Sequence, residues 1–211
     1  MNSIRIFLAM ALVLGPIPVA FAAQDFSADV IYSASEKTAS DAAGVGNSIH
    51  ASSKLYVSKD KMRLETRGSM GTILLVNGDE QMTYALLPSK KEYEPVAAGL
   101  SEYFRVKDAE NACSDWQNAA VQKIDCEKVG HEVVDGRPTV KYRNKGASDA
   151  AISAVWIDVE VKFVVKWQGA GTGVELRNIQ EGQQAADLFT LPADYEITKP
   201  RKGTNKGFSN R

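Results

Sequence analysis

The fold is decided by one stretch of the chain, Leu55-Tyr56-Val57-Ser58-Lys59-Asp60-Lys61-Met62-Arg63-Leu64-Glu65. Apolar and polar residues alternate with a period of two on both sides of Lys59-Asp60-Lys61. This pattern is typical of two half-buried antiparallel strands joined by a tight turn. The stretch therefore predicts a β-hairpin, and a chain whose main element is the strand.

The same period of two continues outward from this hairpin. Before it, Phe26, Ala28, Val30 and Tyr32 alternate with polar residues. After it, turn residues separate further short strands. The strongest of these signals is Asn77-Gly78-Asp79, because Asn-Gly readily adopts the positive φ values of a type I′ turn. We expect about eleven strands in a meander-like order, and thus a mainly β chain.

Residues 96–120 break this pattern. They contain few β-branched residues, and Leu100, Tyr103, Phe104 and Val106 recur at a roughly helical spacing. We expect one or two short helices here that end near Trp116. Another short helix is predicted at 184–189, before a last strand at 195–198.

The N-terminus has the three-part layout of an export signal. Arg5 supplies a positive charge, residues 6–21 are apolar, and Ala20-Phe21-Ala22 offers the small residues that signal peptidase reads. Gly15-Pro16-Ile17-Pro18 shortens the helical part well below the roughly 20 residues of a membrane-spanning helix. We expect cleavage near Ala22 and a soluble periplasmic or secreted protein; the alternative is an uncleaved anchor.

The chain contains two cysteines, Cys113 and Cys126. In an oxidising compartment, an even number of cysteines favours a disulfide. A redox or metal pair is the alternative, but redox enzymes favour a Cys-x-x-Cys spacing and zinc needs two further ligands.

The charge balance excludes one class of function. The formal net charge of −1 at pH 7 argues against binding of nucleic acid. Residues 199–211 hold five lysines and arginines without an acid, which predicts a disordered tail with a weak attraction to anionic lipids. We expect three parts: a signal peptide (1–22), one β domain (23–198) and this tail (199–211).

Motifs of catalysis are missing from the sequence. His50 and His131 lie far apart without ligand spacing, and no phosphate loop, nucleophile elbow or zinc-protease motif occurs. Asp158 and Glu160 are two positions apart and therefore share one strand face, which we interpret as exposed to solvent. We expect neither an enzyme nor a cofactor or metal, although a triad with distant members stays possible.

Three patterns together resemble the LolA-like superfamily of exported proteins, and especially its DUF4412-type members. They are residues 55–65, the run Val155-Trp156-Ile157-Asp158 with the strand that ends at Lys166-Trp167, and residues 188–195. The resemblance spans most of the chain and implies an incomplete, unclosed antiparallel β-barrel around an apolar concavity, with two or three short helices as a lid.

The resemblance also implies candidate site residues. The concave lining is expected at seven apolar positions: Ile73, Leu75, Met82, Tyr84, Leu86, Val155 and Ile157. Arg63 matches the arginine that holds the lid in lipoprotein carriers, and the helix at 100–104 is the expected lid. Core packing is the alternative for each lining residue, because alternating apolar side chains fill any barrel.

Two functions follow as hypotheses. The first is a non-enzymatic periplasmic binding protein for an apolar ligand, such as a lipid or an acyl chain. The second is an envelope interaction or sensor module that binds another protein and no small molecule.

Overall fold

The structure is a computed structural model. It describes residues 25–34, 53–66, 71–78, 82–96, 104–119, 125–145, 152–169 and 172–198. The predicted export signal, the basic tail, His50 and most of the predicted helix at 100–104 lie outside these residues.

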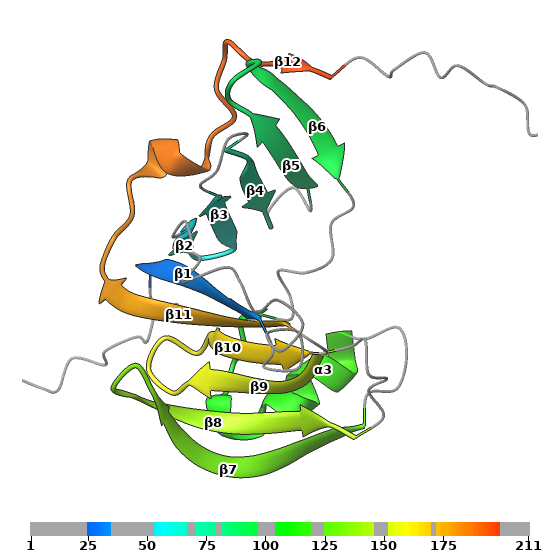
Figure 1. The fold of residues 1–211 in the computed structure, drawn as a ribbon, viewed down its shortest axis with the longest axis vertical. Helices are drawn as coiled ribbons and strands as arrows, with labels where there is room; N and C mark the ends of the chain where they lie inside the picture. The colour runs from blue at the N-terminus through cyan, green and yellow to red at the C-terminus, as the bar shows by residue number, and fades with distance from the viewer. Residues whose placement is uncertain are drawn as a thin grey trace, which may run out of the picture.

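Twelve strands form a single sheet in the described part of the chain, in the order β12-β6-β5-β4-β3-β2-β1-β11-β10-β9-β8-β7. All neighbours are antiparallel except β12 and β6, which are parallel. Figure 1 shows that the sheet curves strongly between its two edges, β12 and β7, without closing. The strands are β1 (Phe26–Ala34), β2 (Ser53–Ser58), β3 (Lys61–Glu65), β4 (Ile73–Asn77), β5 (Met82–Leu87), β6 (Glu92–Val96), β7 (Cys126–Val134), β8 (Arg137–Asn144), β9 (Ile152–Asp158), β10 (Val164–Gly169), β11 (Thr172–Glu181) and β12 (Glu196–Ile197). The predicted fold class, a mainly β chain in an unclosed and largely antiparallel sheet, is thus confirmed.

The hairpin predicted from residues 55–65 is β2 and β3. Leu55 lies opposite Leu64 and Val57 opposite Met62, so four apolar side chains share one face. Lys59 takes a positive φ of 49° in the turn. The β7–β8 turn follows the same logic, because Asp135 and Gly136 have φ values of 49° and 77°, as a type I′ turn requires.

Strand β1 joins the two halves of the sheet. It pairs with β2 on one side and with β11 on the other, which brings the first and the last long strands together (Figure 1). Phe26, Ala28 and Val57 have no exposed surface, and Phe26 packs edge-on against Phe163 with 5.2 Å between ring centroids. The main core lies along this seam.

In the described ranges, short helices with given bounds pack on the sheet: η1 (Ala109–Asn111), α3 (Ala112–Ala119) and η2 (Ala186–Phe189). Asp108 begins η1, because its side chain accepts a hydrogen bond of 2.9 Å from the amide of Glu110. Tyr142 of β8 donates its hydroxyl to the carbonyl of Ala109 at 2.8 Å, and its ring lies 5.4 Å from that of Trp116. These contacts hold η1 and α3 on β8–β10.

The predicted disulfide is present between Cys113 of α3 and Cys126 of β7, with Cα atoms 5.6 Å apart. It ties the only described α-helix to the edge of the sheet. The helix itself lies later in the chain than the sequence predicted, since it runs to Ala119.

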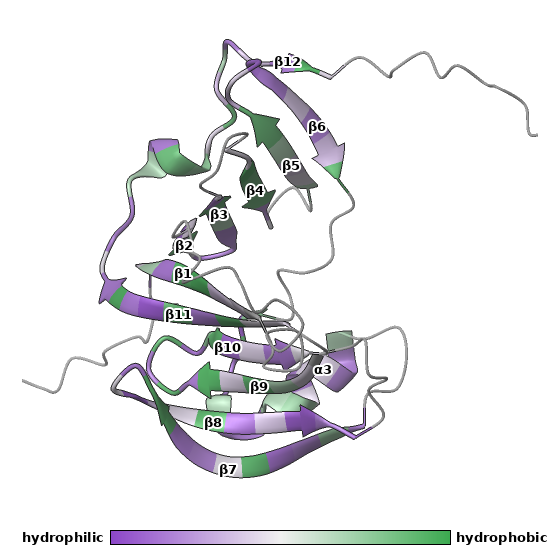
Figure 2. Ribbon diagram, viewed as in Figure 1, coloured by the Kyte–Doolittle hydropathy of each residue, from purple (hydrophilic) through white to green (hydrophobic). Residues whose placement is uncertain are grey.

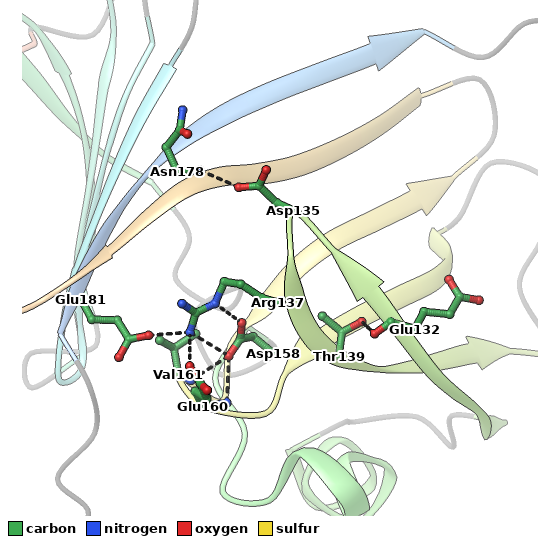
Figure 3. Close-up of polar contacts among 9 residues, drawn as sticks. All are labelled: Glu132, Asp135, Arg137, Thr139, Asp158, Glu160, Val161, Asn178 and Glu181. Atoms are coloured by element: carbon green, nitrogen blue, oxygen red, sulfur yellow. Dashed lines mark hydrogen bonds and ion pairs between the residues drawn. The ribbon is translucent and has the colours of Figure 1, made fainter.

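Asp158 corrects one prediction. It is fully buried at the end of β9, where the sequence suggested a solvated face. Its carboxylate binds the guanidinium of Arg137 and accepts the amides of Glu160 and Val161 at 2.8 and 3.0 Å (Figure 3). Arg137 also binds Glu160 and Glu181, which lie 2.9 and 2.5 Å away. Asp158 and Glu160 therefore belong to a structural ion cluster that fixes the β9–β10 turn.

Candidate functional site

The curved sheet encloses an apolar cavity of about 240 Å³. It lies on the face that carries Val30, Leu55, Leu64 and Leu74, which we call the inner face; the opposite face is the outer face. Its walls come mainly from β1 to β6, with further residues from β10, β11 and the segment before η1. The lining residues are Val30, Tyr32, Leu55, Met62, Leu64, Leu74, Val76, Thr83, Val96, Phe104, Phe163, Trp167 and Leu176.

Strand alternation builds this wall. Because side chains of a strand point to opposite faces in turn, cross-strand partners share a face. Leu55, Leu64 and Leu74 are successive partners across β2, β3 and β4. Met62 and Val76 form a second such pair beside them. In Figure 2 the hydrophobic colour is dense on β4 and β5, whereas the edge strand β6 is mostly hydrophilic.

Aromatic rings close one side of the cavity. Phe104 stacks on Phe163 with 5.9 Å between centroids, and it meets Trp167 edge-on at 5.3 Å. Both Phe104 and Trp167 also contact the core under α3. These rings therefore form the boundary between the hollow half of the inner face and its packed half.

The wall is almost free of polar groups. None of the described residues that line the cavity is charged, and only Tyr32 and Thr83 carry a hydroxyl. Tyr32 is 40% exposed, whereas Thr83 is 6% exposed. Such a surface attracts apolar matter and repels ions, because a charge transferred into it loses its hydration.

None of the seven predicted lining residues is on the wall of this cavity. Five of them lie on the outer face of β4 and β5: Ile73, Leu75, Met82, Tyr84 and Leu86. Leu75 and Leu86 are buried there beneath Phe189 of η2, and Tyr84 packs edge-on against Tyr93 at 5.7 Å. A shift of one residue along a strand exchanges its two faces, so the even-numbered Leu74 and Val76 line the cavity in place of Ile73 and Leu75.

Val155 and Ile157 differ from the other five. They lie on the inner face, because Val155 pairs with Trp167, which lines the cavity. In this half of the sheet, however, η1 and α3 cover the inner face, and both residues pack in the core with Tyr142 and Val164. They fill a packed layer, as the alternative of core packing predicted.

The charged residues of β3 are a local sequence signal that could have predicted which face of the sheet lines the cavity. Arg63 and Glu65 alternate with Met62 and Leu64, and the charged pair marks the outer face. Leu75 and Ile73 lie opposite Arg63 and Glu65, so they are on the same outer face. The aromatic residues Phe104, Phe163 and Trp167 have no such local signal, because they come from distant segments.

Arg63 holds a different element from the one predicted. Its Nη1 donates to the carbonyl of Leu188 in η2 at 3.0 Å, and its Nε donates to Glu65 at 2.7 Å. It therefore fastens η2 to the outer face of the sheet. The predicted lid at 100–104 is described only at Phe104, whose side chain lines the cavity.

The described residues offer little material for other kinds of site. No group of histidine, cysteine, aspartate and glutamate among them is arranged to hold a metal ion. His131 is exposed and lies 2.9 Å from Glu110, which also binds Lys128. No helix in the described ranges is long and apolar enough to cross a membrane.

Comparison with known proteins finds no matching family model and no matching curated protein. Among solved structures, an uncharacterized conserved protein from Thermus thermophilus is 10% identical and covers 84% of this chain and 91% of its own, with a TM-score of 0.49. A chain of the Pseudomonas aeruginosa MucA/MucB complex is 14% identical, and the match covers 85% of this chain and 60% of that chain with a TM-score of 0.46. The Mycobacterium tuberculosis lipoprotein LppX is 15% identical, and the match covers 76% of this chain and 85% of LppX with a TM-score of 0.32. These likenesses are distant, and no function follows from them.

Proposed function

We propose that this chain is a non-enzymatic binding protein that holds the apolar chain of a lipid in the cavity between β1–β6 and the aromatic rings. The supporting observation is the wall itself: thirteen residues, none of them charged, surround about 240 Å³. A hollow of this kind has a physical cost, because its lining residues forgo the contacts that a filled core would supply.

The energetics favour such a ligand. Apolar cavities of about 150 Å³ stay dry and take up benzene, so a larger apolar cavity suits a hydrocarbon chain. Each methylene moved from water into the cavity contributes about 0.8 kcal/mol. A charged head group, in contrast, is expected to stay outside at the rim, where Tyr32 is exposed.

The sequence adds the setting for this function. The export signal at 1–22 supports delivery across a membrane to the periplasm or the exterior, where lipid chains need protein carriers. The β domain at 23–198 would then be the binding unit, and the basic tail at 199–211 a weak contact with anionic lipid surfaces. We also propose that the chain belongs to the LolA-like superfamily and to its DUF4412-type branch. An envelope protein as partner stays a prediction.

Neighbouring residues of β4 provide a matched test. Leu74 lines the cavity and Ile73 lies on the outer face, and both are half-buried. Leu74→Trp is expected to fill the cavity and to reduce uptake of a fluorescent fatty acid by at least about tenfold, since overlap with the ligand costs more than about 1.4 kcal/mol. Ile73→Trp is expected to retain wild-type uptake.

Fluorescence titration measures this difference, and thermal unfolding checks that both variants fold. Organic extraction and mass spectrometry of protein purified without detergent identify any lipid that co-purifies. Failure of the wild-type protein to take up the probe would refute the proposal. Loss of uptake in Ile73→Trp alone would instead place the ligand on the outer face.

A further inference from the structure

Among the described residues that line the cavity, Thr83 is the one buried polar side chain. It lies on β5 between Val76 of β4 and Val96 of β6, its two cross-strand partners. All three residues line the cavity. With 6% of its surface exposed, Thr83 has far less contact with solvent than Tyr32, the only other residue of the wall with a hydroxyl.

No hydrogen bond joins the Thr83 hydroxyl to another described residue, but this oxygen is not fully buried: the one fully buried side-chain atom without a partner among the described residues is Oδ1 of Asn77. The Thr83 oxygen is therefore accessible from the cavity. The other buried threonine of the described sheet differs in this respect. Thr139 is 1% exposed, and its hydroxyl donates to the carbonyl of Glu132 at 2.9 Å. Because an unsatisfied buried hydroxyl destabilises a protein, buried polar groups are nearly always paired. The Thr83 hydroxyl is instead open to the cavity, so whatever the cavity holds, water or a ligand, can pair with it.

Valine would also fit this position. It has nearly the same shape as threonine, it suits a strand as well, and its neighbours Val76 and Val96 are valines. The hydroxyl adds nothing to the packing of the apo protein. It gives the cavity one fixed point at which a ligand can form a hydrogen bond.

We propose that Thr83 is a specificity-determining residue, which recognises a neutral oxygen function on the apolar chain held in the cavity. This inference rests on the proposed function and adds the chemical class of the ligand: an acyl chain with a hydroxyl or an ester carbonyl along its length. A hydroxyl can both donate and accept, so either group pairs with Thr83.

The surroundings of Thr83 exclude a charged group as its partner. The described part of the wall has no cation to compensate a carboxylate or phosphate, and an uncompensated ion in an apolar site is strongly disfavoured. The oxygen function must therefore be neutral and must lie within the chain, apart from an ionised head group. A plain hydrocarbon chain would fill the same space but leave the Thr83 hydroxyl unpaired.

Competition experiments with the full mature protein test this inference. The probes are tetradecanoic acid and a set of its monohydroxy derivatives with the hydroxyl at different carbons, each of which displaces a fluorescent fatty acid. In the wild-type protein, one derivative is expected to bind about fivefold to tenfold more tightly than the parent acid, which corresponds to one net hydrogen bond. In Thr83→Val this preference is expected to vanish or reverse, with the parent acid bound at least as well as before.

Thr139→Val is the matched control, because it removes a buried hydroxyl that has a partner and lies outside the cavity. It is expected to lower Tm without changing the preference among ligands, whereas Thr83→Val is expected to leave Tm unchanged or raise it. A fall in Tm in Thr83→Val as large as that in Thr139→Val would show that the Thr83 hydroxyl has a structural partner, and would overturn the inference.

The outcomes separate this inference from the proposed function. If neither the parent acid nor its derivatives displace the probe from the wild-type protein, the proposed function fails. If all of them displace it equally from both the wild-type protein and Thr83→Val, the cavity binds lipid, but Thr83 does not recognise an oxygen function.

Discussion

Trp156 lies between two lysines on the outer face of the sheet. The ammonium groups of Lys141 and Lys166 are 4.6 and 5.1 Å from the centre of its ring. Its indole donates to Glu132 at 2.6 Å, and Lys141 binds the same carboxylate at 2.9 Å. The hydrogen bond from Trp156, followed by that from Lys141, lowers the pKa of Glu132 below its usual value.

This shift predicts a pH dependence of stability. Because the pKa of Glu132 is lower in the folded than in the unfolded state, its contribution is present above the ordinary pKa of about 4.5 and is lost as the pH falls through the lowered value. Glu132→Gln should lower the free energy of unfolding by less than about 1 kcal/mol at neutral pH, since the carboxylate is half exposed. The gap should close as the pH falls below this lowered pKa.

Urea unfolding at several pH values, followed by tryptophan fluorescence, measures this gap. Glu196→Gln, at an exposed position in β12, serves as the control. A gap between wild type and Glu132→Gln that stays constant over the whole acidic range would contradict the assignment of the stabilising charge to Glu132.

At the same scale, the sequence predicts side-chain environment only in part. Alternation in residues 55–65 correctly pairs Leu55 and Val57 on one face. Alternation alone does not tell which face of a two-sided apolar strand turns inward, and β4 and β5 are apolar on both faces. For this reason Ile73 and Leu75 were expected on the inner face, although Leu74 and Val76 lie there.

Among the elements, η2 depends most on a single contact. Arg63 is one of the more buried arginines of the described chain, and its guanidinium supplies the hydrogen bond to the carbonyl of Leu188. Phe189 of the same short helix packs on Leu75 and Leu86. Because a helix of one turn has little stability of its own, its position requires both the hydrogen bond and the buried ring.

We therefore expect Arg63→Met to loosen η2 selectively. The loss of a hydrogen bond from a charged donor should lower the free energy of unfolding by about 1–2 kcal/mol. The amides of Leu188 and Thr190, which bond to Ala185 and Asp187, should exchange faster with solvent. Hydrogen exchange measures this directly, and Arg177→Met, an exposed outer-face arginine, is the control. Equal acceleration of exchange in α3 would argue for a global effect.

Most elements were predictable, because strand alternation and turn residues are local signals. The strands β2, β3, β9 and β10, the η2 helix and the final β12 lie close to where their sequence patterns placed them. The start of α3 did not follow from local spacing. Its position depends on Trp116 packing against Tyr142, a contact between segments far apart in the chain, and single-sequence patterns carry no information on such contacts.

For the whole molecule, one sheet face serves two purposes. On β8–β10 the inner face is covered by η1 and α3 and packs as a conventional core. On β1–β5 the same face lines the cavity, to which Phe104 also contributes. The aromatic rings of Phe104, Phe163 and Trp167 separate the two regions. The place of the cavity thus depends on rings that come from segments far apart in the chain, a non-local property.

A cavity of fixed size makes a last prediction about affinity. If a lipid chain enters it from the rim, each added methylene should tighten binding by about fourfold, from about 0.8 kcal/mol per buried CH₂, until the cavity is full. Beyond that length, further methylenes remain in water and affinity should level off. Calorimetry with saturated fatty acids of increasing length measures the position of this plateau. Leu74→Trp should move the plateau to shorter chains, because the larger ring occupies part of the same volume. A constant gain over the whole series, in the wild type and the variant alike, would mean that the chains bind as aggregates on the surface and do not enter the cavity.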